Sequence, residues 1–119
     1  GLGGHALEMA LASGVTVVLN ADALPLMPRA LEYARDGLIP AGSHLNRKYW
    51  ACSTRVAGGV DEALTSLAFD AQTSGGLLLA VPPEQVAEAR ALLLAGGDMA
   101  CEVGEVIETE ADGTALVLC

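Results

Sequence analysis

The chain has 119 residues, of which 52% are hydrophobic, and this length and composition suit one globular domain with a substantial core. Its formal net charge is −9, from 6 Lys and Arg against 15 Asp and Glu, which excludes general binding to nucleic acid or to an anionic membrane. Any phosphate would have to be held by main-chain N–H groups, a metal ion or residues of another segment.

The sequence predicts neither a membrane span nor a secretion signal. No apolar run approaches the roughly 18 residues that a spanning helix needs, and no basic segment followed by an apolar one opens the chain. Cys52, Cys101 and Cys119 form no CxxC pair and, with His5 and His44, no zinc pattern. We therefore expect free thiols, a cytoplasmic location and no metal site in this chain.

The first half of the sequence predicts two helices and one strand. Strong helix formers over residues 6–13 predict a helix that stops at Gly14. The β-branched segment 15–19 predicts a buried strand, and a second helix is predicted over residues 29–35. Residues 39–59 are polar and aperiodic, so we expect a long loop, anchored by Trp50.

The second half predicts two further helices and three strands. Asp61 is positioned to cap a helix over 62–67, and a turn over 69–76 leads into an apolar strand, 77–81, buried on both faces. Pro82 and Pro83 open a long helix that ends at Gly96-Gly97, and its buried face should carry Val86, Ala89, Leu92 and Leu93. Strands over 102–107 and 114–118 flank Asp112-Gly113, a hairpin signal. The expected fold is α+β, a mixed sheet of about four strands with packed helices.

Glycines cluster where the first helix begins, in Gly1-Leu2-Gly3-Gly4-His5. A helix N-terminus offers unpaired N–H groups and partial positive charge to an anion, although such glycines also simply allow close packing. His5 either donates to a phosphate or packs against the fold, and packing is slightly favoured.

Two other segments are candidate sites. Gln72-Thr73-Ser74-Gly75-Gly76 combines an amide, hydroxyls and glycines, which suits either an anion-holding turn of main-chain N–H groups or an ordinary tight turn. Residues 40–50 with Arg55 carry three of the basic residues, Arg47, Lys48 and Arg55, and predict either a local positive patch or a solvated loop.

These segments, in this order, resemble a known family. The matching segments are GLGGH followed by LEMA, then P-x-G-S-x-x-N, D-x-QTSGGLL, V-P-P-E and G-E-V. Together they are similar to the C-terminal domain of selenophosphate synthetases, in the aminoimidazole-ribonucleotide-synthetase-like superfamily. The similarity runs from Gly1 to about Ile107. Ala71 stands where the family usually has Pro, which loosens the loop slightly without removing its hydroxyls.

The resemblance implies one C-terminal domain over residues 1–119, with an N-terminal ATP-binding domain outside this chain. The family converts ATP, selenide and water into selenophosphate, AMP and phosphate, using Mg and a catalytic Cys or selenocysteine of the N-terminal domain, and it implies a homodimer. It assigns no catalytic residue to this chain and no tightly bound cofactor. The positions carried over to the phosphate cleft are Gly3, Gly4, His5, Asn46, Gln72, Thr73, Ser74, Gly75 and Gly76.

Two alternatives remain open. In the first, the chain is the C-terminal domain of another ATP-dependent synthetase or kinase of the same superfamily. In the second, it is a non-catalytic binding or dimerisation module whose loops only shape a surface.

Overall fold

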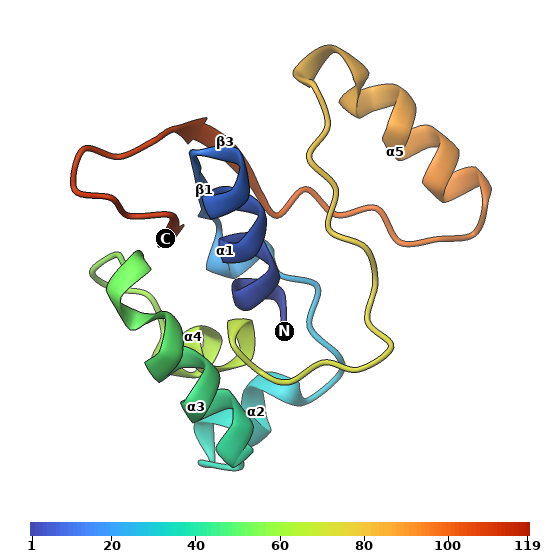
Figure 1. The fold of residues 1–119 in the computed structure, drawn as a ribbon. Coiled ribbons are helices and arrows are strands. Elements are labelled where there is room, and N and C mark those ends of the chain that lie inside the picture. The colour runs from blue at the N-terminus through green and yellow to red at the C-terminus, as the bar shows by residue number, and fades with distance from the viewer.

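The computed structural model describes residues 1–119 (Figure 1). Four strands form a mixed sheet in the order β2-β4-β1-β3. The α+β fold class is therefore confirmed. The strands are β1 (Val15–Leu19), β2 (Thr54–Val56), β3 (Gly104–Glu108) and β4 (Leu116–Leu118). The helices are α1 (Leu2–Ser13), α2 (Ala30–Arg35), α3 (Ala41–Trp50), α4 (Glu62–Ala68) and α5 (Val86–Ala95), with short 3-10 turns at Ala21–Ala23, Ala51–Ser53 and Pro83–Gln85.

The strand β1 occupies the middle of the sheet. It pairs in parallel with β4, with Val17 opposite Leu116, and antiparallel with β3, with Val15 opposite Glu108. The predicted hairpin between the last two strands is wrong, because β1 lies between them. The turn itself exists, since Gly113 has a φ of 79° and the Asp112 carboxylate accepts a hydrogen bond from the Thr114 N–H.

Local signals fix several elements correctly. Gly14 adopts the left-handed conformation, φ 64°, that ends α1, and β1 follows at once over the predicted residues. The Asp61 carboxylate caps α4 by accepting from the Ala63 N–H at 2.8 Å. The first helix starts earlier than predicted, so Gly3, Gly4 and His5 lie inside its first turn.

The segment predicted as a long loop contains the helix α3 and the edge strand β2, so that prediction is wrong. The apolar periodicity of a core helix is missing because the inward positions of α3 include the polar residues Ser43 and Asn46. Their partners lie at the end of α4, more than twenty residues away, and nothing in the local sequence announces them.

The predicted buried strand over residues 77–81 is also wrong. Leu77 is 88% exposed and Leu79 is 54% exposed, and no main-chain hydrogen bond involves residues 77–81. Both sides of β1 are already occupied, by β4 and β3, so the apolar run has no place beside the central strand.

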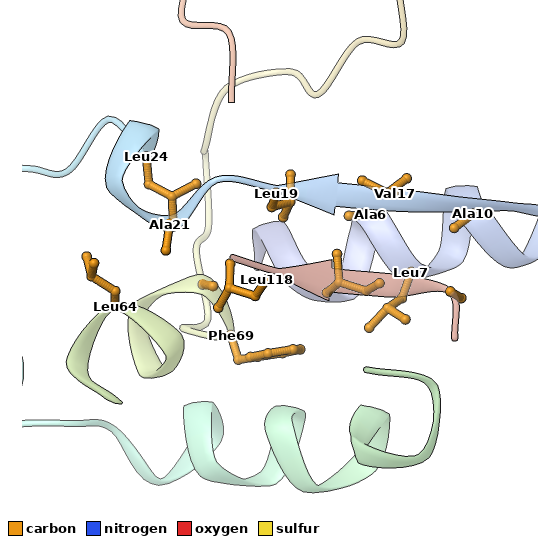
Figure 2. Packing of buried hydrophobic residues seen from close by; sticks show 13 residues of the cluster. Ala6, Leu7, Ala10, Val17, Leu19, Ala21, Leu24, Leu64, Phe69 and Leu118 are labelled. Atoms are coloured by element: carbon orange, nitrogen blue, oxygen red, sulfur yellow. The ribbon is translucent and has the colours of Figure 1, made fainter. Parts of the chain in front are cut away.

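The hydrophobic core joins α1, the central strands and α4. Leu7 of α1, Leu19 of β1 and Leu116 and Leu118 of β4 are almost fully buried, and Phe69 at the end of α4 is 1% exposed. Figure 2 shows the Phe69 ring below β4, on the side facing α3. These contacts bring the start of α1 and the end of α4 into one layer.

Residues 71–103, here called the arm, extend from the rest of the chain, here called the body, which comprises residues 1–70 and 104–119. Leu78 and Val103, near the two ends of the arm, pack against the core of the body. The arm runs out to α5 and back, as the yellow and orange segment of Figure 1 shows, and none of its residues is buried. The predicted buried face of α5 is only partly correct, because Val86, Ala89 and Leu93 are partly covered and Leu92 is 67% exposed.

Candidate functional site

The helix α1 begins with N–H groups that form no hydrogen bond within residues 1–119. The first hydrogen bond of the helix runs from the His5 N–H to the Gly1 carbonyl at 3.1 Å, and no side chain caps the start. The N–H groups of Leu2, Gly3 and Gly4 therefore have no main-chain acceptor, and the positive end of the helix dipole lies there.

The glycines at this helix start also allow a close approach to the end of α4. A Cβ on Gly1 would lie 1.9 Å from the Asp70 carbonyl oxygen, and one on Gly3 would lie 2.9 Å from the Phe69 ring. A Cβ on Gly4 would lie 3.3 Å from the Trp50 Nε1. Close packing, one of the two interpretations of these glycines, is confirmed, and the N–H groups of Gly3 and Gly4 form no main-chain hydrogen bond.

We call Phe69 and Asp70, where the chain leaves α4, the α4 corner. The helix α3 also contacts this corner. The Ser43 hydroxyl donates to the Asp70 carboxylate at 2.5 Å, and the Asn46 amide donates to the Phe69 carbonyl at 3.1 Å. Asn46 thus lies at the same corner as Gly3.

The turn of residues 72–76 leaves directly from the α4 corner and is exposed throughout. The Gln72 amide donates to the Leu67 carbonyl at 3.3 Å, which ties the base of the turn to α4. Ser74 has a φ of 56°, whereas Gly75 and Gly76 do not have positive φ. Sequence reasoning assigned the special backbone to the glycines, but a serine adopts it, and such strain collects at functional turns.

The structure therefore brings Gly3, Gly4 and Asn46 around one corner, with the Gln72–Gly76 turn attached to it. His5 is different: the preference for a packed His5 is wrong, because its side chain is 70% exposed and pairs with Glu8 at 3.0 Å. Two hollows are present: one of about 150 Å³ borders the α4 corner and is lined by Phe69 and Arg47, and one of about 220 Å³ lies between α1, β1 and β3. None of the residues carried over to the phosphate cleft lines either hollow.

The positive patch suggested by Arg47, Lys48 and Arg55 is largely neutralised. Arg47 forms a two-pronged ion pair with Glu62, and Arg55 pairs with Glu110. Only Lys48 of the three has no ion pair. Any anion at the corner would rely on N–H groups and hydroxyls rather than on this patch.

Sequence reasoning gave Trp50 only the task of anchoring a loop and included Ser43 and Asp70 only as letters of the family motifs. In the structure Ser43 binds Asp70 of the α4 corner, and Trp50 contacts Gly4. The available signal was the spacing of Ser43 and Asn46, which places both on one face of a helix. Because residues 39–59 were predicted to form a loop, the spacing of Ser43 and Asn46 did not indicate a shared helix face.

Two carboxylates of the body are perturbed. Hydrogen bonds from Arg35 and from the Ala63 N–H lower the pKa of Asp61, and the Thr114 hydrogen bonds lower the pKa of Asp112. Both are structural groups, one capping a helix and one closing a turn, and neither lies at the α4 corner.

No group of three or more His, Cys, Asp or Glu side chains is arranged to hold a metal ion. Cys52, Cys101 and Cys119 are unpaired and exposed, as expected for free thiols. No helix has the length and apolar character needed to cross a membrane.

Comparison with known proteins places this geometry in a family context. A family model described as AIR synthase related protein, C-terminal domain, matches residues 1–116. Selenide, water dikinase of Nitratidesulfovibrio vulgaris (strain DSM 19637 / Miyazaki F) is 53% identical over 118 residues, which cover 99% of this chain and 34% of the relative.

Two further relatives have similar coverage. Selenide, water dikinase of Nitratidesulfovibrio vulgaris (strain DP4) is 47% identical over 118 residues, 99% of this chain and 34% of the relative. Selenide, water dikinase 2 of Peptoclostridium acidaminophilum is 40% identical over 108 residues, 90% of this chain and 31% of the relative. The chain spans about a third of the length of these curated relatives.

Proposed function

Because this chain belongs to the family of AIR synthase related proteins, C-terminal domain, we propose that it works as the C-terminal domain of a selenide, water dikinase. Such an enzyme makes selenophosphate, AMP and phosphate from ATP, selenide and water. The agreement of the relatives' names supports this reaction over that of another ATP-dependent synthetase or kinase of the superfamily.

The domain contributes one wall of the phosphotransfer site. The observation that carries this role is the meeting of the α1 start and the base of the Gln72–Gly76 turn at the α4 corner. Unpaired N–H groups of α1 and the hydroxyls of Thr73 and Ser74 are donors suited to phosphate oxygens. In this role the domain orients the phosphates and excludes water, and it supplies no nucleophile.

The donors present fit an ATP phosphate better than they fit a metal ion. Leu2, Gly3 and Gly4 offer N–H groups with no competing side-chain cap. One oxygen of the nearest carboxylate, Asp70, accepts from Ser43, and the chain has no cluster of metal ligands. Magnesium, when bound, would offset phosphate charge from ligands outside this chain, namely those of an N-terminal ATP-binding domain.

The proposal includes the partners that the family implies. An N-terminal ATP-binding domain would close over the α4 corner, selenide would be the second substrate, and the whole protein would be a homodimer. The three exposed, unpaired cysteines are compatible with work in the reducing cytoplasm. The alternative of a non-catalytic module is less well supported, because the similar relatives are named as enzymes.

A domain exchange tests the proposal. Residues 1–119 of this chain would replace the matching residues of the Miyazaki F relative, to which they are 53% identical, and selenide-dependent AMP formation would be measured. We expect activity within about tenfold of the unmodified relative, and a further loss of about 100-fold for Thr73→Ala/Ser74→Ala at an unchanged melting temperature.

Matched controls make both outcomes informative. The relative's own domain, rejoined at the same junctions, controls for damage at the joints, and Thr109→Ala, a hydroxyl variant far from the corner, controls for general effects. A folded exchange protein without activity, beside an active rejoined control, would overturn the proposed function. Unchanged turnover in the Thr73→Ala/Ser74→Ala variant would remove the turn from the site.

A further inference from the structure

Two polar side chains of α3 lie one helical turn apart and both bind the α4 corner. Ser43 is 2% exposed, and its hydroxyl donates to the Asp70 carboxylate at 2.5 Å. Asn46 donates to the Phe69 carbonyl at 3.1 Å, which is one of the acceptors that a helix end leaves unpaired. A buried hydroxyl and a short hydrogen bond to a charged group make this a well-defined contact.

The α4 corner is also contacted by α1. Gly1 and Gly3 approach Asp70 and Phe69 so closely that no Cβ fits without movement. The corner is thus fixed between α3 and α1, and the next residues along the chain are Ala71 and the Gln72–Gly76 turn. A displacement of Asp70 would move the turn relative to the α1 N–H groups.

Stability alone does not explain the acid at this position. A carboxylate at the C-terminal end of a helix meets the negative end of the helix dipole, which is unfavourable, and α4 ends directly before Phe69 and Asp70. The Ser43 hydroxyl offsets that cost with a directed hydrogen bond. Such a pair fixes an orientation more than it adds stability.

We propose that Ser43 and Asp70 form a positioning pair that sets the Thr73–Ser74 turn against the start of α1, so that both face the same phosphate groups. The phosphate part of this inference rests on the proposed function. In this proposal the pair acts through the turn that follows it.

The first arm of the test uses the 119-residue chain and needs no activity. Amide chemical shifts would be measured by NMR for Ser43→Ala, for Asp70→Asn and for the double variant. We expect the amides of Leu2–Gly4 and of Thr73–Gly76 to move together, while those of α5 stay in place. We also expect the double variant to resemble Ser43→Ala, because a shared contact is lost only once.

The second arm uses the domain-exchange protein and compares kinetics with stability. We expect Ser43→Ala to lower kcat/KM for ATP by about 10- to 100-fold. The matched control is Thr54→Val, which removes the hydrogen bond from the Thr54 hydroxyl to the Trp50 carbonyl, 2.9 Å, at the far end of α3. That variant should lower the melting temperature comparably and leave kcat/KM unchanged.

The possible results of the two arms test different parts of the proposal. Equal kinetic behaviour of Ser43→Ala and Thr54→Val, with only the melting temperature lowered, would overturn the positioning role. Turn amides that stay in place in Ser43→Ala would also overturn it, even if the exchange protein were inactive. An inactive exchange protein beside amides that do move would overturn the proposed function and leave the contact between pair and turn established.

Discussion

The body and the arm contain the same kinds of residue but use them differently. All 13 residues of the core cluster lie in the body, whereas the arm buries none of its residues and exposes Leu77, Leu79, Leu92, Leu94 and Met99. The helix α5 forms as well as α1 does, so helix formation and helix burial are separate outcomes. Local sequence determines the first, and the second depends on a complementary surface.

The largest expected difference between the two regions is in hydrogen exchange. The amides of β1 are paired on both sides, while residues 77–81 have no main-chain hydrogen bonds. We expect protection in β1 to exceed that in 77–81 by about a thousandfold or more, measured by exchange and NMR. Equal protection would mean that 77–81 is a paired strand in solution, and the comparison would fail.

Matched leucines sharpen the contrast in packing. Leu7→Ala removes a fully buried side chain from α1 and should cost about 2–5 kcal/mol in the free energy of unfolding. Leu92→Ala makes the same change in α5, where the residue is 67% exposed, and should cost less than about 0.5 kcal/mol. Urea unfolding of both variants measures this, and a large loss for Leu92→Ala would show that α5 is packed.

Matched glycines test how tightly the body is closed at the α4 corner. Gly3→Ala would place a Cβ 2.9 Å from the Phe69 ring and 3.1 Å from the Ala68 carbonyl, and we expect a net loss of about 1–2 kcal/mol despite the better helix propensity of Ala. Gly58→Ala meets nothing within 4 Å and should be nearly neutral. A stabilising Gly3→Ala would show that α1 and the α4 corner separate readily.

Acid should lower the stability of the body through Asp61, and we expect this effect to be smaller than those of the leucine and glycine substitutions. Its pKa is held below the ordinary 3.8 by Arg35 and the Ala63 N–H, so its contribution is present above that value and lost as pH falls through the lowered pKa. The drop in urea midpoint between about pH 5 and about pH 3 should therefore be smaller for Asp61→Asn.

The arm supplies the control for this titration. Glu102→Gln breaks only an exposed pair with Arg90, 3.5 Å long, and should leave both the midpoint and its pH dependence unchanged. An Asp61→Asn variant whose midpoint falls as steeply as that of the original chain would assign the acid sensitivity to other carboxylates.

Elements with a local signal were predictable from sequence, and elements defined by distant partners were not. Gly14 ends α1, β-branched residues make β1, and Asp61 caps α4, each through contacts within a few residues. The helix α3 was missed because its inward polar groups find partners only at the α4 corner. The apolar run 77–81 was misassigned because hydrophobicity specifies a preference for burial and not a neighbour.

The family was predicted correctly from the same short segments, and family matching confirms it. The candidate site was predicted only in outline. Gly3, Gly4 and Asn46 lie at one corner. The contact between Ser43 and Asp70 is tertiary, and the left-handed conformation of Ser74 reflects backbone strain, and a sequence motif specifies neither. The phosphate-facing role of these residues stays a prediction.

The strand order has a consequence for how the chain reaches this structure. The parallel neighbours β1 and β4 pair Val17 with Leu116, about a hundred residues apart in the sequence. Contacts between such distant positions slow folding, since a long loop must close before the pairing yields any stabilisation. During synthesis, β1 therefore leaves the ribosome long before β4 exists, and the edge of β1 that pairs with β4 stays open until this last strand arrives.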